Sequence, residues 1–196
     1  YKRTANHCQA LLFQNPDDLA FFTEAGLTGQ ARVELLGGSG VDLQRFKPHS
    51  HGPEQIRAAR QELGLGPGDV VFSMAARLVA DKGVREFLHA ARALAGSCPR
   101  ARFLLVGEAD PANPASLSAQ ELKELRQETN IVLTGWREDM ALVWAMSDVA
   151  VLPSYREGLP VSLQEAAASG LPIATTDAPG CRELAAGPHG QEATIL

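Results

Sequence analysis

Residues 154–170 read SYREGLPVSLQEAAASG and combine a strand end, a tight turn, a helix start and two spaced carboxylates. Before them, Val149 to Leu152 is a short apolar run of the kind that forms a buried parallel strand. Pro160 suits the first position of a helix, because its missing N–H costs nothing there and its fixed φ is helical. Good helix formers continue to Ser169, and Gly170 predicts the end of the helix.

This order of strand, turn and helix predicts an anion-binding site. A helix that begins after a glycine turn leaves the N–H groups of its first turn unpaired, and phosphate is the anion most often bound there. Glu157 lies in the turn, and Glu165 lies one to two turns inside the helix, so the two carboxylates can bracket a ligand at the helix start. Because carboxylates repel phosphate, we expect them to contact a neutral group rich in hydroxyls, such as a sugar or a ribose.

The composition is typical of a globular protein. The chain has 196 residues, of which 45% are hydrophobic and 21% charged, enough for one sizeable core or for one domain and part of another. The formal net charge of -5 argues against nucleic acid as a partner, because a nucleic-acid-binding protein needs a basic face. The sequence contains no apolar run of the ~18 residues that span a bilayer, and no signal peptide is expected at its start. The first residue is not Met, which leaves open that the chain is a fragment.

The cysteines and histidines do not have the spacing of metal ligands. Cys8, Cys98 and Cys181 are far apart, which favours buried or free thiols in a reducing compartment. His49 and His51 could form half of a metal site, but without a partner cluster in the sequence a solvated loop is the simpler interpretation.

The chain before residue 54 predicts short elements and a linker. Residues 10–14 are a short apolar run, and Asn15 caps a brief helix that runs past Phe21 and Phe22. Val33 to Leu36 is another expected strand, and residues 49–53 are a linker by composition.

From residue 54 onward, helices and strands alternate. We expect strands at Val70–Ala75, Arg102–Val106, Ile131–Leu133, Val149–Leu152, Pro172–Thr175 and Ala193–Leu196, and helices at Glu54–Leu63, Val84–Leu94, Ser118–Glu128, Asp139–Met146 and near Arg182–Leu184. Repeated βα units of this size predict an α/β fold with a doubly wound, Rossmann-like parallel sheet that binds ligands at the carboxyl ends of its strands. A dinucleotide dehydrogenase is the least expected function, because Gly-x-Gly-x-x-Gly does not follow the first of these strands.

A basic pair follows the strand Val70–Ala75. Arg77 and Lys82 lie five residues apart at its carboxyl end, where both can reach one diphosphate, Arg through a planar fork and Lys as a point charge. Taken alone, Arg77, Asp81 and Lys82 are equally compatible with a solvated set of salt bridges.

The sequence Glu157-Gly158-Leu159-Pro160, followed after four residues by Glu165, resembles the signature of retaining glycosyltransferases of family 4, which have the GT-B fold. The resemblance extends over nearly the whole chain. It implies that Glu157 contacts the donor sugar, that Glu165 binds the ribose hydroxyls of the nucleotide, and that the residues Gly158, Leu159 and Pro160 belong to the donor site.

The same resemblance gives roles to residues outside this signature. Arg77 and Lys82 have the spacing of the family's arginine and lysine, which hold the donor diphosphate and stabilise the leaving group, so together with Glu157 they are the expected catalytic residues. Residues 37–42 match the family's hinge loop over the cleft, which implies that Gly40 lies at the donor site. The glycines of this loop are equally well explained as turn formers.

Three further segments match parts of the family's donor site. Gly107 follows a strand, as does the family's glycine turn near the nucleotide, although the family more often has a second glycine where this chain has Glu108. Trp136 and Arg137 match the border of the nucleobase and become candidate walls of the base pocket, while a packing role explains Trp136 equally well. Residues 177–183 resemble the family's loop facing the sugar and phosphates, most closely in bacterial transferases of surface-polysaccharide assembly; a proline-glycine turn explains them locally.

The resemblance implies a division of the chain and a function. Residues 1–48 would be a remnant of an N-terminal acceptor domain with its hinge loop, and residues 49–196 would be the donor nucleotide-sugar-binding domain, the C-terminal half of a GT-B fold. The implied reaction is a retaining, metal-independent transfer of a sugar from a nucleoside diphosphate sugar, with UDP expected, to a polysaccharide or lipid-linked acceptor. This chain alone would bind the donor but scarcely catalyse, in the cytoplasm, with the parent enzyme peripherally at the inner face of the membrane.

No cofactor and no metal are expected. The sequence contains no Asp-x-Asp, the segment that holds a metal-bridged diphosphate in the other main glycosyltransferase fold, and Arg77, Lys82 and the helix start would supply the positive charge instead.

Two other functions fit the same plan. One is a GT-B sugar-nucleotide epimerase or a glycogen-synthase relative, and the other is a non-catalytic module that binds a nucleotide sugar. In either case the apolar side chains near the start of the chain would lack packing partners, so we expect residues 1–48 to be mobile or to rest on a second copy of the chain.

Overall fold

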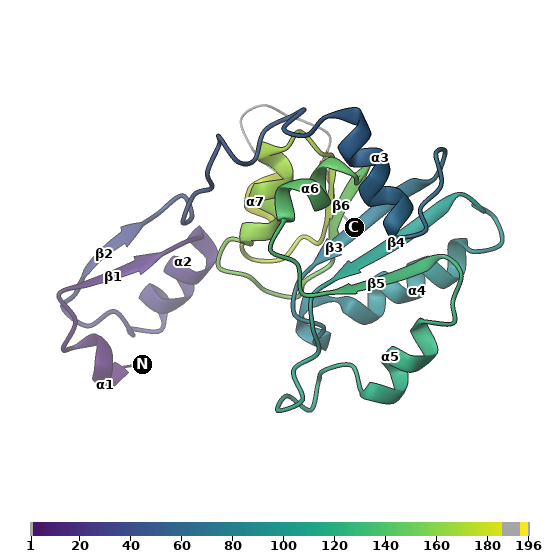
Figure 1. The fold of residues 1–196 in the computed structure, drawn as a ribbon. Helices are drawn as coiled ribbons and strands as arrows, with labels where there is room; N and C mark the ends of the chain where they lie inside the picture. The colour runs from purple at the N-terminus through teal and green to yellow at the C-terminus, as the bar shows by residue number, and fades with distance from the viewer. Residues whose placement is uncertain (1, 186–192, 196) are drawn as a thin grey trace.

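The chain forms a small N-terminal unit beside a larger α/β unit (Figure 1). The computed structural model describes residues 2–185 and 193–195. The N-terminal unit contains α1 (Lys2–Ala5), β1 (Ala10–Phe13), α2 (Pro16–Glu24) and β2 (Arg32–Leu35), and its two strands pair in parallel. Asn15 caps α2 and Pro16 opens it, as the sequence predicts.

The larger unit is built on a parallel sheet. Its described strands are β3 (Val70–Ala75), β4 (Ala101–Val106), β5 (Ile131–Gly135), β6 (Val149–Leu152), β7 (Ile173–Thr175) and β8 (Ala193–Ile195). Their order is β5-β4-β3-β6-β7-β8, and each neighbouring pair is parallel. The chain therefore builds outward from β3 in one direction and then returns to the other side of β3 with β6. The predicted doubly wound, Rossmann-like sheet is confirmed, and its topological switch point lies between β3 and β6.

Helices cover both faces of this sheet (Figure 1). They are α3 (Pro53–Glu62), α4 (Val84–Leu94), α5 (Ala119–Leu125), α6 (Met140–Ala145), α7 (Val161–Ala168) and the short α8 (Arg182–Ala185), with a 3₁₀ turn at Ala80–Lys82. Side chains of β4 alternate between the two faces. Leu104 packs with α3 and α6 on one face, and Phe103 and Leu105 pack with α4 and α5 on the other.

Most expected boundaries hold within two or three residues, and the one-residue differences at two helix starts have physical causes. Pro160, expected as the first helical residue, is instead the N-cap of α7, with an extended backbone at φ −67° and ψ 115°. The helix expected from Ser118 begins one residue later, because Ser118 is its N-cap and forms a capping box with Glu121. The last expected strand is present as β8, while Leu196 lies outside the described residues.

Two further observations concern the described residues. Within them, the helices fall short of the length and apolar character that crossing a bilayer requires. All three cysteines are free thiols, with Cys8 and Cys98 exposed and Cys181 buried, where burial raises the pKa of its thiol.

Candidate functional site

The loops that follow β3 and β6 are joined at the switch point of the sheet. The hydroxyl of Ser154 donates a hydrogen bond to the carbonyl of Asp81 at 2.9 Å, and the N–H of Tyr155 donates to the same oxygen at 3.0 Å. Gly83 permits this approach, because it has φ 75° and an added Cβ would overlap the carbonyl of Pro153. These contacts place Lys82 directly beside the loop that carries Glu157.

Lys82 and Glu157 form an ion pair in this position. The ammonium of Lys82 lies 2.6 Å from both carboxylate oxygens of Glu157. The Lys82 side chain is 23% exposed and that of Glu157 is 11% exposed, so the pair is largely withdrawn from water. Lys82 and Glu157 are thus in direct contact although they lie far apart in the sequence. The first is expected to bind the diphosphate and the second the sugar.

Glu165 lies in the second turn of α7, and its carboxylate contacts a residue of α6. Its carboxylate accepts a hydrogen bond at 3.2 Å from the indole N–H of Trp144, which is buried in α6. Burial raises the pKa of the Glu165 carboxyl above its ordinary value, and the Trp144 hydrogen bond and the charge of Arg45 oppose this shift. Glu165 is therefore an oriented acceptor in a partly dry environment.

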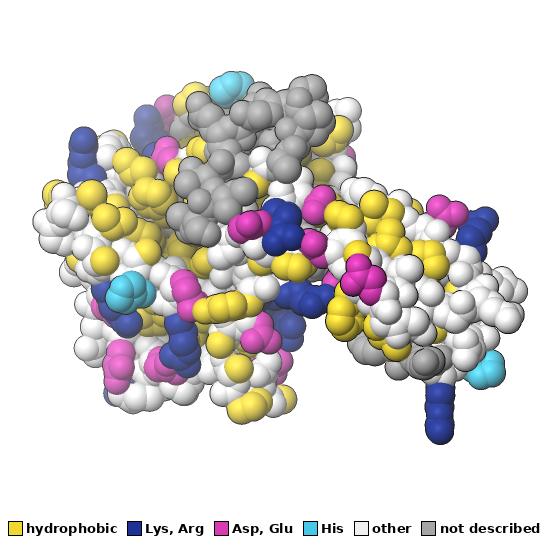
Figure 2. All heavy atoms as spheres, turned by 180° about the vertical axis from the view of Figure 1, so that it is seen from behind, with side chains coloured by type: hydrophobic (Ala, Val, Ile, Leu, Met, Phe, Trp, Pro, Cys, Tyr) yellow, Lys and Arg dark blue, Asp and Glu magenta, His cyan; other side chains and the backbone are white. Residues whose placement is uncertain are grey.

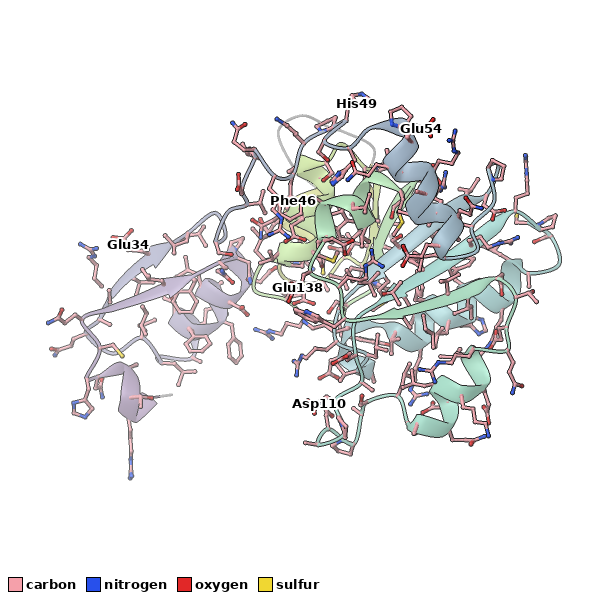
Figure 3. The ribbon with its side chains drawn as sticks, in the orientation of Figure 1. Glu34, Phe46, His49, Glu54, Asp110 and Glu138 are labelled. Atoms are coloured by element: carbon pink, nitrogen blue, oxygen red, sulfur yellow. The ribbon has the colours of Figure 1, made fainter. Side chains whose placement is uncertain are left out.

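A cleft of about 750 Å³ opens above Glu165. Its walls come from the segment between β2 and α3, the ends of β3, β4 and β5 and the start of α7: Arg45, Ala75, Ala76, Arg77, Val106, Gly107, Glu108, Ala109, Asp110, Pro111, Trp136, Arg137, Glu138, Met140, Ser162 and Glu165. In Figure 3 the labelled Asp110 and Glu138 mark the side of the larger unit that faces the N-terminal unit. A cleft of this volume is large enough for a nucleotide.

A second cavity of about 450 Å³ adjoins this cleft at Arg77. It is lined by Asp18, Arg77, Val79, Asp81, Lys82, Asn113, Tyr155, Arg156, Glu157 and Gly158. The Arg77 side chain is 65% exposed, and its guanidinium lies 3.6 Å from the carboxylate of Asp110. Lys82 therefore pairs with Glu157 rather than with Asp81 of its own loop, and Arg77 pairs with Asp110 while facing both cavities. A diphosphate-binding role for the two cations stays a prediction.

Several residues expected at the nucleotide line the larger cleft, among them Gly107, Trp136 and Arg137. Gly107 has φ 132°, and an added Cβ would overlap the carbonyl of Ala76, so the backbone after β4 lies directly against the loop after β3. Trp136 is 70% exposed in the cleft wall, which excludes the alternative of a packing aromatic. Arg137 is held by Asp139 at 2.7 and 2.5 Å, and this pairing lowers the pKa of the Asp139 carboxyl and raises that of the guanidinium.

Three expected residues lie outside both cavity linings. An added Cβ at Gly40 would meet nothing within 4 Å, whereas one at Gly38 of the same loop would overlap the side chain of Leu159 and lie 3.0 Å from that of Gln164. Leu159 and Pro160 form the approach to α7 without lining either cavity, while Gly158 lines the smaller one. A direct donor contact of Gly40, Leu159 or Pro160 stays a prediction.

The sequence did not single out two residues that support the site. Trp144 orients Glu165 through its indole N–H. The sequence feature that could have indicated this contact is the tryptophan itself, because a buried indole N–H needs an acceptor. Arg45 lines the cleft and donates to the carbonyl of Glu138 at 2.5 Å, which joins the segment between β2 and α3 to the loop after β5. In the described part of the chain, His, Cys, Asp and Glu side chains form no cluster of three or more that could hold a metal ion.

Comparison with known proteins agrees with this geometry. The family described as Glycosyl transferases group 1 matches residues 69–196. The chain is 31% identical over 183 residues to the N,N'-diacetylbacillosaminyl-diphospho-undecaprenol alpha-1,3-N-acetylgalactosaminyltransferase of Campylobacter jejuni, covering 93% of this chain and 46% of that protein. It is 32% identical over 144 residues to the UDP-Gal:alpha-D-GlcNAc-diphosphoundecaprenol alpha-1,3-galactosyltransferase of Escherichia coli, covering 72% of this chain and 36% of that protein. The chain thus spans less than half the length of these relatives.

Solved structures give the same result for the fold. HepE of Anabaena, in complex with UDP and glucose, superposes with a TM-score of 0.80 at 25% identity, covering all of this chain and 51% of HepE. WaaG, a glycosyltransferase involved in lipopolysaccharide biosynthesis, superposes with a TM-score of 0.75 at 22% identity over 95% of this chain and 48% of WaaG, which supports the fold alone. The chain belongs to the group 1 glycosyl transferases, and its parallel sheet with flanking helices is that of the GT-B glycosyltransferases.

Proposed function

We propose that this chain is the donor-binding half of a retaining, metal-independent glycosyltransferase that uses a nucleoside diphosphate sugar. One observation carries the proposal: Arg77, Lys82, Glu157 and Glu165 open onto two adjoining cavities at the switch point of the sheet. Cations able to bind a diphosphate and carboxylates able to bind hydroxyls therefore meet where this fold class binds its ligands.

Each part of the donor has a matching part of the site. The diphosphate is bound by Arg77 and Lys82 and by the unpaired N–H groups at the start of α7. The ribose hydroxyls donate to Glu165, and the base lies in the larger cleft beside Trp136. The donor sugar occupies the smaller cavity against Glu157. UDP is the proposed nucleotide, because HepE binds UDP and glucose on a similar fold.

The chemical task of this half is to stabilise the departing nucleoside diphosphate. Negative charge grows on the diphosphate as its bond to the sugar breaks, and fixed cations nearby lower the energy of that state. Arg77 and Lys82 are placed to supply this charge without a metal, and the α7 N–H groups add to it. The retaining outcome rests on the resemblance of Glu157 and Glu165 to the signature of family 4.

The acceptor is proposed to be a polysaccharide or a lipid-linked sugar. The relatives from C. jejuni and E. coli have names that specify acceptors carried on diphospho-undecaprenol. Residues 1–48 are proposed to belong to the acceptor domain and its hinge, so this chain alone binds donor and scarcely transfers sugar. The parent enzyme is proposed to work in the cytoplasm at the inner face of the membrane.

Calorimetric titration of the purified chain with UDP, GDP and ADP, with and without EDTA, tests the proposal. We expect one nucleotide to bind, with an affinity that EDTA does not change. A strict need for a divalent ion would contradict metal independence, and no binding of any of the three would contradict the donor site. Incubation of the longer parent protein with the matching nucleotide sugar then separates a transferase from a binding module, and the anomeric configuration of the product tests retention.

A further inference from the structure

Asn15 connects the N-terminal unit to the loop that carries Glu157. Its side chain is fully buried, although it belongs to the small unit. The amide nitrogen of Asn15 donates to the carbonyl of Gly158 at 2.8 Å and to the carbonyl of Glu157 at 3.2 Å. Its side-chain oxygen accepts from the N–H of Asp18 at 2.7 Å and so caps α2. One side chain thus fixes the start of α2 and the turn at residues 157–158.

The opposite side of this turn is held as well. The N–H of Glu157 donates to the carbonyl of Pro179 at 3.0 Å. An added Cβ at Gly180 would overlap the carbonyl oxygens of both Glu157 and Gly158, so the two backbones are in direct contact. The turn is therefore clamped between Asn15 and the segment Pro179–Gly180.

Ion pairs join the same two units around Asn15. Asp18 pairs with Arg156, and Asp17 lies 2.7 Å from Arg182, which also binds Asp177 at 2.6 Å. Figure 2 shows basic and acidic side chains gathered where the smaller unit meets the larger one. The first turn of α2 thus contacts both the loop that carries Glu157 and the start of α8. Among the side chains that make these contacts, Asn15 is fully buried.

We propose that Asn15 is a positioning residue that holds the Glu157–Gly158 backbone, and with it the Glu157 carboxylate, in the place where the donor sugar is bound. This inference rests on the proposed function of Glu157. It assigns to the N-terminal unit a role in donor recognition: the position of α2 determines how Glu157 contacts the sugar. The nucleotide is bound by Arg77, Lys82 and Glu165, and the hydrogen bonds of Asn15 go instead to Asp18, Glu157 and Gly158.

The test separates the two hydrogen-bonding roles of Asn15. Asn15→Ser keeps a good N-cap for α2 but removes the amide donors to the turn, and Asn15→Ala removes both. Ser118→Ala is the matched control, because it removes a helix cap on α5 far from the turn. For each variant, calorimetry measures the affinity for UDP and for UDP-glucose, and hydrogen exchange measures the N–H groups of Glu157, Gly158 and Leu159. Urea unfolding confirms that each variant is folded.

We expect Asn15→Ser and Asn15→Ala to weaken UDP-glucose binding about tenfold, because the partly buried carbonyls of Glu157 and Gly158 lose their donor. The affinity for UDP should change by less than about twofold, because Arg77, Lys82 and Glu165 keep their positions. Exchange at residues 157–159 should become faster in both variants and stay unchanged in Ser118→Ala. Equal loss of UDP and UDP-glucose, or unchanged exchange in Asn15→Ser, would overturn the inference while leaving donor binding by the wild-type chain intact. If the wild-type chain binds neither ligand, the proposed function fails, and the exchange rates alone decide whether Asn15 positions the turn.

Discussion

Arg77 and Lys82 carry the same charge in different surroundings. Lys82 is fixed by Glu157 and is largely buried, whereas Arg77 is mostly exposed and only loosely associated with Asp110. Removing Lys82 would leave the Glu157 carboxylate without its partner, so its loss would affect stability and binding together. Arg77 is the cleaner probe of diphosphate binding, because its ion pair with Asp110 is long and largely exposed and is expected to contribute little to stability.

The first prediction concerns Arg77. Arg77→Ala should weaken nucleoside diphosphate binding about tenfold or more, since a charge-assisted hydrogen bond to phosphate contributes roughly 1.5–3 kcal/mol. Its unfolding midpoint in urea should match that of the wild type. Arg57→Ala is the matched control, because Arg57 is an exposed arginine paired within α3 to Glu54. If calorimetry finds the same nucleoside diphosphate affinity for both variants, Arg77 does not bind the diphosphate.

The second prediction concerns pH. In the proposed donor site, the ionised Glu165 carboxylate accepts hydrogen bonds from the ribose hydroxyls. Burial raises the pKa of this carboxyl, so its protonation begins at a higher pH than for an ordinary glutamate. UDP-glucose affinity should therefore be constant near neutral pH and fall as the pH drops through this raised pKa. The Glu165→Gln variant should bind UDP-glucose more weakly, but its affinity should not fall as the pH drops. Coincident pH profiles of the wild type and Glu165→Gln in titrations would contradict the role given to Glu165.

At this scale the sequence indicates the candidate site residues better than the residues that support them. Glu157 and Glu165 are proposed from their spacing, and Arg77 and Lys82 from their place after a strand. Trp144 could not be assigned in this way, because its contact with Glu165 depends on how α6 and α7 pack. The same limit applies to Asn15, whose role as a helix cap is visible in the sequence but whose partners lie more than a hundred residues away.

At the scale of elements, the ends of β3, β4 and β6 determine the site. Close backbone approaches at Gly83 and Gly107 bring the three following loops together, and both residues have positive φ. The sequence predicts these strands well because each is a short, mostly apolar run, and those of β4 and β6 are followed directly by Gly107 and Pro153. It misplaces the start of α7 by one residue because Pro160 is compatible with the first helical position and with the N-cap.

The third prediction concerns Gly83. Gly83→Ala should lower the free energy of unfolding by more than about 1–2 kcal/mol, because a left-handed backbone is unfavourable for Ala and the new Cβ would also overlap the Pro153 carbonyl. Gly96→Ala is the control, since an added Cβ at Gly96 meets nothing within 4 Å. Urea unfolding monitored by circular dichroism measures both. Equal stability of the two variants would show that the loops after β3 and β6 do not need this close approach.

At the scale of the whole molecule, the two units differ in how much apolar surface they bury. The six-stranded sheet of the larger unit is covered by helices, whereas the N-terminal unit has a two-stranded sheet and leaves Leu12, Phe21 and Leu35 exposed. Asn15 and the ion pairs of Asp17 and Asp18 connect the units. The family resemblance implies a division at about residue 48, which stays a prediction. The contacts between the two units could not be predicted from the sequence, because they depend on the packing of distant segments.

The fourth prediction follows from this difference. Residues 2–48 should open at a lower free energy than the strands of the larger unit, because few buried apolar contacts hold them. Native-state hydrogen exchange on a chain shown by sedimentation to be a monomer should find weaker protection in β1 and β2 than in β3 and β4. Equal protection in the two units of a proven monomer would contradict the expectation.

The claim on which the account depends is that Arg77, Lys82, Glu157 and Glu165 form one donor site. A crystal structure of the chain with bound UDP-glucose tests it most directly. We predict the diphosphate at Arg77 and Lys82, the ribose hydroxyls at Glu165 and the glucose at Glu157. A nucleotide seated instead in the cavity of about 810 Å³ beside α3, or with its diphosphate beyond hydrogen-bonding distance, about 3.5 Å, of both Arg77 and Lys82, would contradict it.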